Sequence, residues 1–412
     1  MSSTLALDFG TSNSAAAMID NGSLRRIPMS SQGDTLPTAV FFPDDGSAML
    51  IGDDAVAALI AGDDGRFMRA LKSILGTSLF HEKRMIGGKR RTLAEIVTAF
   101  ITTIKTRAEN QTGESFSAVL SGRPVHFHSS DPARDAKAEQ DLRGCYQAAG
   151  FQQIDFLFEP EAAALASHQL DTSGQIGLIV DIGGGTSDFT LFRSKGDTAE
   201  ILSSHGLRLG GTDFDHVISM SHAMPLLGQG GELRRTLGSG LLPVPNAIYT
   251  ELATWAKIPF LYTRDTLRKI EDMERHAVQP EKIARLLKVI EEEHGHQLAF
   301  AVEKGKIAAN EQKNDAAIQM GFIEGSLTAP INAQSMNATL ADFQIKLGLA
   351  IDETLTAANI QPAQIGVLVL VGGSSLMNMV AEEAQRKCPS ARLRYSDAFT
   401  AVVDGLALAT KS

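Results

Sequence analysis

The stretch VDIGGGTSDFT, residues 180–190, decides how the chain is read, because three glycines stand between two aspartates directly after an apolar run. Glycine packs no side chain and costs about 0.5–1 kcal/mol of backbone entropy relative to alanine, so it is poor material for the end of a strand. A glycine turn does, however, let backbone N–H groups surround an anion without crowding from Cβ atoms. The stretch therefore favours a phosphate-binding turn, although GGGT alone could equally be a tight turn whose aspartates act as caps.

Two other apolar runs also end in glycine, TLALDFGTSNSA at 4–15 and IGVLVLVGGSSLM at 365–377. All three runs are rich in Val, Ile or Leu and alternate little, which is typical of strands buried on both faces. Asp8 and Asp181 each close their run, and a Thr-Ser pair follows the glycines in both cases. We therefore predict an internal duplication that gives two similar lobes, each with an Asp-Gly-Thr turn.

The aspartates at these turns indicate a metal ion. A carboxylate repels phosphate unless a cation lies between them. Asp8, Asp181 and Asp188 therefore make sense around Mg²⁺ and its waters, with the metal bridging phosphate oxygens. On this interpretation the glycines admit the anion and the aspartates hold its counter-ion.

Composition limits the classes of partner. The chain has 412 residues, which suggests two or three domains, and a net charge of −10 without a Lys/Arg block that stands out, so we expect no nucleic-acid partner. The N-terminus has no signal-peptide pattern, and the longest apolar runs are far shorter than the ~20 residues of a membrane helix. Cys145 and Cys388 are interpreted as buried free thiols. These features predict a cytoplasmic protein with no membrane partner.

Local signals predict the elements between the turns. Asp131 as N-cap, Pro132 at the first helical position and Gly150 at the end frame one helix, in which Leu142, Cys145, Tyr146 and Ala149 share a face. The strand IDFLF precedes a helix that has Pro160 in its first turn, which places Glu159 at the junction. His126 and His128 alternate with apolar residues and could share one strand face, but a metal site would need more ligands nearby. Further helices are expected over 280–293, through most of 218–300, and at the C-terminal end.

Six motifs together resemble the ATPase domain of the DnaK-type heat-shock chaperones. They occur in the family's order and spacing, and the resemblance covers nearly the whole chain: DFGTSNSAAAM, FEPEAAALAS, VDIGGGTSDFTLF, LGGTDFD, VEKGKIAAN and LVGGSS. The segments SGRPVHF (121–127) and MPLLGQGGE (224–232) look more like the divergent YegD-like branch. The resemblance implies an α/β actin-like ATPase fold of two ribonuclease-H-like lobes, with ATP or ADP and Mg²⁺, and K⁺ as a further candidate, in the cleft between them.

The same resemblance implies a division of the chain. Lobe I is expected over 1–172, with an inserted subdomain at about 36–113 and completion by a C-terminal helix over 397–412. Lobe II is expected over 173–396, with a mostly helical insert at about 218–310.

The resemblance also implies roles for individual residues. Asp8 and Asp181 would hold the hydrated metal, while Lys72, in ALKSILG, would help position the γ-phosphate or the water. The implied catalytic set is Lys72, Glu159, Asp181, Thr186 and Asp188. The implied nucleotide-binding set is Gly10, Thr11, Ser12, Asn13, Gly183, Gly184, Gly185, Thr186, Gly210, Gly211, Glu303, Lys306, Asn310, Gly372, Gly373 and Ser374.

Three positions depart from the family pattern. Leu376 stands where the family has an arginine that stacks on adenine, Asn310 where a serine is usual, and Glu161 where a threonine is usual. Losing the arginine could cost roughly 0.5–2 kcal/mol of cation–π attraction. The sequence ends after GLALATKS without the family's linker, peptide-binding β-sandwich and lid. We therefore expect another surface, or an unknown protein partner or co-chaperone, to respond to the nucleotide.

Several functions are compatible with these residues. The first is a chaperone-like protein that binds ATP and hydrolyses it slowly. The alternatives are a nucleotide-responsive binding protein with little hydrolysis, an actin-fold small-molecule kinase, and a filament-forming actin homologue.

Overall fold

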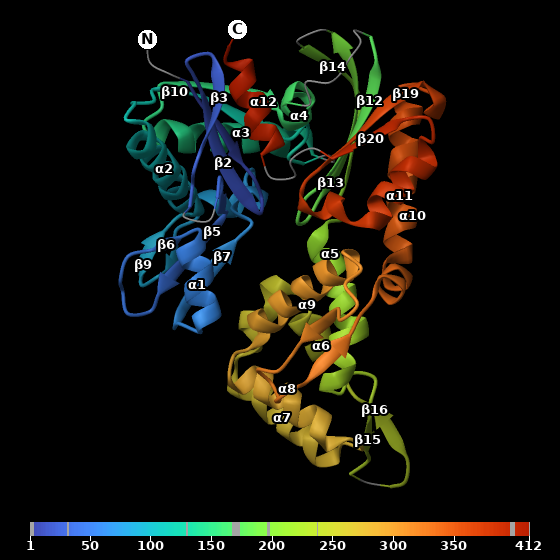
Figure 1. Ribbon diagram of the computed structural model, residues 1–412. Helices are drawn as coiled ribbons and strands as arrows, with labels where there is room; N and C mark the ends of the chain where they lie inside the picture. The colour runs from blue at the N-terminus through green and yellow to red at the C-terminus, as the bar shows by residue number, and fades with distance from the viewer. Residues whose placement is uncertain are drawn as a thin grey trace. The chain divides into compact units, whose positions relative to one another are not determined.

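The computed structural model describes residues 4–30, 33–128, 131–166, 174–195, 198–236, 238–395 and 400–411 (Figure 1). The chain forms two compact units, one of Met1–Arg208 with Leu347–Ser412 and the other of Leu209–Lys346. The expected lobe boundaries at 172/173 and 396/397 lie outside the described residues, so the predicted division stays a prediction.

The first unit contains two large sheets. In the first, the path runs β11-β10-β1-β2-β3, and β4 pairs with β2. Its strands are β1 (Thr4–Phe9), β2 (Asn13–Asp20), β3 (Ser23–Ile27), β4 (Thr35–Pro37), β10 (Ala118–Arg123) and β11 (Gln153–Phe158). Strand β1 pairs antiparallel with β2 and parallel with β10, and it is buried along most of its length.

The second large sheet repeats this arrangement, with the order β14-β13-β12-β19-β20. Its strands are β12 (Ile176–Ile182), β13 (Ser187–Lys195), β14 (Thr198–Leu207), β19 (Ile365–Val371) and β20 (Arg392–Tyr395). Strand β12 pairs antiparallel with β13 and parallel with β19, as β1 does with β2 and β10. The three glycine-ended runs are thus β1, β12 and β19, and the topology agrees with the duplication predicted from the sequence.

Helices α4 (Glu159–Ala166) and α12 (Ala401–Ala409) pack against each other and join the two sheets (Figure 1). One buried cluster contains alanines of β1, β2 and α4, apolar residues of β12, β13 and β19, and the apolar face of α12. The Arg26 guanidinium of β3 donates two hydrogen bonds, of 2.8 and 2.6 Å, to the Asp404 carboxylate of α12. The helix that begins with Glu159 is therefore fixed by the C-terminal part of the chain.

The other elements of the first unit surround these sheets. Its remaining helices are α1 (Asp53–Ala61), α2 (Leu93–Thr112), α3 (Pro132–Ala148), α11 (Asn378–Lys387), and the 3₁₀ turns η1 (Leu71–Ile74), η2 (Ser78–His81), η6 (Pro362–Gln364) and η7 (Gly373–Leu376). One small sheet has the strand order β6 (Leu50–Ile51), β5 (Ala39–Pro43), β7 (Gly65–Arg69). A separate hairpin pairs β8 (Arg84–Ile86) with β9 (Lys89–Arg91).

The second unit is mostly helical. Its helices are α5 (Gly211–Ile218), the π-helical η3 (Ser219–Ala223), η4 (Met224–Leu227), α6 (Ala247–Leu252), η5 (Trp255–Leu261), α7 (Arg264–His276), α8 (Pro280–Glu291) and α9 (Gly295–Asn310). Two hairpins complete it: one pairs β15 (Glu232–Arg234) with β16 (Leu241–Pro243), and the other pairs β17 (Ala317–Gln319) with β18 (Thr328–Pro330). Helix α10 (Ala333–Ala357) begins in this unit and ends in the first. None of the described helices of the chain is both long and apolar enough to cross a bilayer.

Most local predictions are confirmed. Asp131 caps α3 by accepting from the Arg134 N–H, and Pro132 is its first residue. Both cysteines are buried and unbridged, and burial raises the pKa of each thiol to about 11. The prediction that His126 and His128 could share one strand face is wrong, because β10 ends at Arg123 and both histidines lie in an irregular segment.

The packing of α12 against α4 predicts a strong effect of Gly405→Ala. A Cβ at this position would lie 1.7 Å from the Ala162 carbonyl oxygen, so the two helices would have to separate. We expect the free energy of unfolding, measured in urea, to fall by about 1–3 kcal/mol or more. Gly144→Ala in α3 is the control, because its Cβ meets no atom within 4 Å, and it should raise stability by about 0.5–1 kcal/mol. Equal effects of the two substitutions would contradict this packing.

Candidate functional site

The glycine turns that follow β1 and β12 lie next to each other. A Cβ on Gly184 would come within 2.7 Å of the Ser12 Oγ, so the second turn touches the first. A Cβ on Gly10 would lie 2.1 Å from the Asn13 carbonyl oxygen, which leaves room only for glycine at this tight turn. The Gly183 N–H donates to the Thr186 carbonyl at 2.9 Å and closes the other turn. The fold thus brings together the two stretches that resemble each other in sequence.

Strand register places the aspartates. Asp181 lies directly opposite Asp188 on β13, so their side chains share one face, whereas Asp8 lies opposite Ala15. A Cβ on Gly206 of β14 would come within 3.1 Å of the Asp188 carboxylate. The second hairpin therefore carries two carboxylates where the first carries one.

The third glycine turn, after β19, also reaches this place. Gly372 has φ +84°, and a Cβ on it would lie 2.6 Å from the Asp181 Oδ1 and from the Ile182 carbonyl oxygen. Both the backbone angle and the close approach require glycine here. Gly373 and Ser374 continue into η7, which ends at Leu376, whose side chain is exposed.

Lys72 and Glu159 complete the cluster from the side of the first sheet. Lys72, in η1, is buried, and its ammonium group forms an ion pair with the Glu159 carboxylate. Glu159 is the first residue of α4, directly after β11, as predicted, where the helix dipole favours a negative charge. A Cβ on Gly122 of β10 would come within 3.2 Å of the Glu159 Cγ, so this glycine leaves space for the glutamate.

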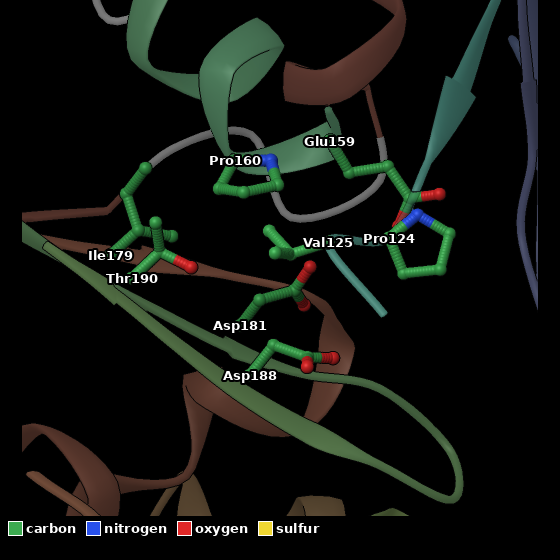
Figure 2. A pocket seen from close by; sticks show the side chains of 8 residues that line it. All are labelled: Pro124, Val125, Glu159, Pro160, Ile179, Asp181, Asp188 and Thr190. Carbon is green, nitrogen blue, oxygen red and sulfur yellow. The ribbon is translucent and has the colours of Figure 1, made fainter. Parts of the chain in front are cut away.

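A small pocket opens beside these carboxylates. Its lining comes from both sheets and from the segment after β10: Pro124, Val125, Glu159, Pro160, Ile179, Asp181, Asp188 and Thr190. Figure 2 shows that the Asp181 and Asp188 side chains project from neighbouring strands into the same space. The lining therefore combines three carboxyl groups and the Thr190 hydroxyl with four apolar side chains.

The charges in this cluster are unbalanced. Burial raises the pKa of Asp8 to about 7, with a further contribution from Glu159, while Lys72 opposes the shift. Burial likewise raises the pKa of Asp181 and of Asp188 to about 7, and neighbouring carboxylates add to both shifts. Burial acts to lower the pKa of Lys72, but the facing carboxylates outweigh it and raise that pKa above its usual value. One ammonium group faces four carboxyl groups, and such an oxygen-rich set suits a hard divalent cation.

The other predicted site residues fall into two groups. Thr11, Ser12, Asn13, Gly185 and Thr186 belong to the adjoining turns of the first unit, where Ser12 and Thr186 are exposed. The second unit holds the remaining predicted residues, which are Gly210, Gly211, Glu303, Lys306 and Asn310.

Within the second unit, an ion pair joins the elements that carry these residues. Gly210 and Gly211 form the N-terminus of α5, and Glu303, Lys306 and Asn310 lie on α9. Lys306 is buried, and its Nζ lies 2.7 Å from the Asp215 carboxylate of α5.

Sequence reasoning missed the part of the pocket that follows β10. Pro124 and Val125 line the pocket, and so do Pro160, Ile179 and Thr190. A usable signal was present, because Gly122 and Pro124 follow the short apolar run AVL at 118–120, as glycines follow the apolar runs at the other site turns.

Comparison with known families agrees with this geometry. The family described as Hsp70 protein matches residues 4–226, which is more than half of the chain and includes both glycine turns, Lys72 and Glu159. The chain belongs to the Hsp70 family. It accordingly has the actin-like ATPase fold, in which the two similar sheets are the centres of the two lobes.

Individual relatives of this Hsp70-family protein are named Chaperone protein DnaK. The one from Endomicrobium trichonymphae is 33% identical over 227 residues, which is 53% of this chain and 34% of that protein. The one from Methanothermobacter thermautotrophicus is 33% identical over 221 residues, 52% of this chain and 35% of the relative. The one from Thermoplasma volcanium is 34% identical over 226 residues, which is 53% of this chain and 35% of that protein. Each match covers about a third of the relative's length.

The raised carboxyl pKa values predict a pH-dependent stability of the ligand-free Hsp70-family protein. The pKa of Asp181 is about 7 in the folded state and 3.8 without the fold, so the folded state binds protons that the unfolded state releases. Stability should therefore fall as pH rises between about 4 and 7, and Asp181→Asn should reduce this fall by on the order of 1–2 kcal/mol.

Urea unfolding across this pH range measures the effect. Asp45→Asn is the control, because Asp45 is exposed and its pKa is lowered by the backbone N–H of Ser47, so this variant should retain the slope of the unmodified protein. Parallel curves for the unmodified protein and Asp181→Asn would show that the Asp181 carboxyl does not titrate as inferred.

Proposed function

We propose that this site binds ATP and hydrolyses it slowly to ADP and phosphate, as part of a chaperone-like activity. The observation that carries the proposal is the contact between two similar glycine turns, with Lys72 and four carboxyl groups beside them. Adjacent glycine turns offer N–H donors and room for phosphate oxygens from two sides. An ammonium group and a divalent cation together can offset the charge of a triphosphate.

Asp8 and Asp181 are the proposed holders of hydrated Mg²⁺, with K⁺ as a further candidate ion. Among the residues that the structure describes, no three His, Cys, Asp or Glu side chains are placed to ligate an ion directly. The proposed contacts therefore run through water, as in sites where Mg²⁺ keeps part of its hydration shell. When bound, the ion would supply positive charge to the phosphate oxygens.

The chain's own residues divide the proposed hydrolysis between positioning and electrostatics. Glu159, Thr186 and Asp188 would orient the attacking water. Lys72 stays cationic, because its pKa is raised, and would stabilise the charge that develops on the transferred phosphoryl group rather than act as a base. No covalent intermediate on the protein is required.

The nucleoside contacts are proposed from the predicted residues. Gly372, Gly373 and Ser374 would lie beneath the adenosine, and Gly210 and Gly211 beside the nucleotide. The set on α9 would contact the nucleoside and consists of Glu303, Lys306 and Asn310. We further propose that the chain represents the YegD-like branch and that nucleotide state controls an unidentified protein partner or co-chaperone.

A second candidate function is a nucleotide-responsive binding protein with little hydrolysis. It is favoured by Leu376, which is 42% exposed at the end of η7, where an arginine would offer a planar cation to adenine. Tight binding of a non-hydrolysable ATP analogue together with no phosphate release would select this function over the first.

Lys72→Ala tests the proposed hydrolysis. We expect the single-turnover rate of ATP hydrolysis to fall by about 100- to 1000-fold, as when one transition-state donor is removed. The control is Lys105→Ala, which removes a lysine that bonds the Gly150 carbonyl at 3.1 Å and lies over the Phe151 ring, away from the pocket. A Lys72→Ala rate equal to that of Lys105→Ala would remove Lys72 from the mechanism.

Leu376→Arg tests where the base is bound. A guanidinium at the end of η7 should raise the affinity for ATP by about 0.5–2 kcal/mol, which calorimetry measures directly. Leu79→Arg adds the same charge at another exposed leucine of the first unit and should leave the affinity unchanged. Equal affinities for the two variants would place the base elsewhere.

A further inference from the structure

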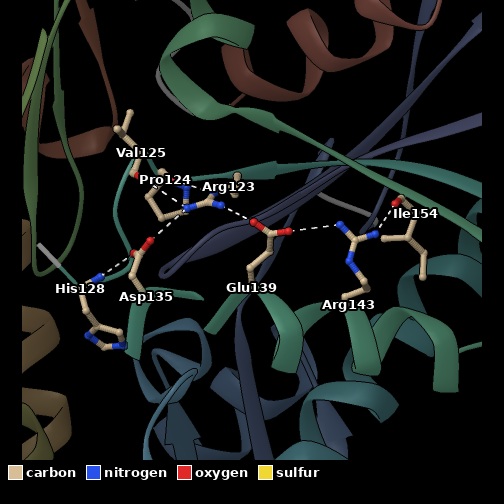
Figure 3. Close-up of polar contacts among 8 residues, drawn as sticks. All are labelled: Arg123, Pro124, Val125, His128, Asp135, Glu139, Arg143 and Ile154. Atoms are coloured by element: carbon tan, nitrogen blue, oxygen red, sulfur yellow. Dashed lines mark hydrogen bonds and ion pairs between the residues drawn. The ribbon is translucent and has the colours of Figure 1, made fainter. Parts of the chain in front are cut away.

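Arg123 is the last residue of β10 and directly precedes the pocket residues Pro124 and Val125. Its side chain is 14% exposed, and its guanidinium turns back onto the backbone that follows it (Figure 3). The Nε–H donates to the Pro124 carbonyl at 3.1 Å, and an Nη2–H donates to the Val125 carbonyl at 3.3 Å. The two pocket residues are therefore held through their main chain by one side chain.

Two carboxylates of α3 hold the guanidinium in place. Glu139 pairs with Nη1, and the Asp135 Oδ2 lies 3.4 Å from Nη2. Asp135 also accepts a hydrogen bond of 3.1 Å from the His128 N–H, so the far end of the segment 124–128 is tied to the same helix. A lysine would carry the charge but could not reach these groups in the fixed geometry of a guanidinium fork.

Arg123 also contacts the strand that leads to Glu159. Its guanidinium carbon lies 5.3 Å from the centre of the Phe158 ring and 5.2 Å from that of Phe127. Phe158 is the neighbour of Glu159 and the register partner of Arg123 between β10 and β11. The Arg123 guanidinium therefore binds the backbone carbonyls of Pro124 and Val125. It also contacts Phe158, the residue directly before Glu159.

We propose that Arg123 is a positioning residue that fixes Pro124, Val125 and Glu159 around the pocket and thereby sets the rate of hydrolysis rather than the affinity for nucleotide. The inference rests on the proposed function of the site. The physical reason is that catalysis by positioning is sensitive to small displacements, since about 1 Å can cost 100-fold in rate. Without Arg123, the Pro124 and Val125 carbonyls lose this donor, and the Phe127 and Phe158 rings each lose a cation contact.

Arg123→Ala and Arg123→Lys test the proposal, with Arg143→Ala as a matched control. Arg143 makes contacts of the same kinds, since it pairs with Glu139 at 3.2 Å and donates to the Ile154 carbonyl at 2.6 Å (Figure 3). It also lies over the Phe156 ring, and none of these three partners lines the pocket. Both Arg123 variants should lower the single-turnover rate by about 10- to 100-fold and change the Kd of a non-hydrolysable ATP analogue by less than about 3-fold. Arg143→Ala should leave both the rate and the Kd within about 3-fold of the unmodified protein.

Hydrogen exchange gives a second measurement that does not depend on hydrolysis. The His128 amide, which donates to the Asp135 carboxylate, should exchange faster in both Arg123 variants than in the unmodified protein, and Arg143→Ala should leave it unchanged. Unchanged exchange in Arg123→Ala, or an equal loss of rate in Arg143→Ala, would overturn the positioning role. If the unmodified protein binds nucleotide but does not hydrolyse it, the proposed function fails, and the exchange measurement still decides whether Arg123 holds the segment.

Discussion

The ion pair between Lys72 and Glu159 is the interaction on which the site depends. It places one buried ammonium group among carboxyl groups that arrive from separate elements, with Asp8 at the end of β1 and Asp181 and Asp188 on the hairpin of β12 and β13. Removing one partner of a buried pair leaves the other charge uncompensated, which is costly. The carboxyl groups outnumber the ammonium group, and an additional positive charge beside them would favour their ionised forms.

Backbone geometry makes this gathering of charge possible. The turns can approach each other and the neighbouring strands because side chains are missing at Gly184, which lies beside Ser12 of the other sheet, and at Gly372, which lies beside Asp181 of the adjacent strand. A similar close approach, of Gly405 to the Ala162 carbonyl, holds the helix that begins with Glu159. Glycine thus contributes through the space it leaves between elements as well as through its freedom in turns.

The sequence predicted the parts of the site that carry local signals. Asp8 and Asp181 close apolar runs before glycine turns, and the repetition of that pattern predicted an internal duplication with two similar lobes. Glu159 followed from a proline that marks the first turn of a helix.

The sequence could not predict contacts made across the fold. No local pattern marks Arg123, because its carboxylate partners Asp135 and Glu139 are supplied by α3. The histidines after it alternate as in a strand, but Pro124 follows the end of β10 and the backbone leaves the sheet.

The most direct test of the account is a crystal structure with a non-hydrolysable ATP analogue and Mn²⁺ in place of Mg²⁺. We predict an anomalous peak near Asp8 and Asp181, with the triphosphate between the turns at 10–13 and 183–186. A triphosphate bound elsewhere, or a metal peak remote from both aspartates, would contradict the account.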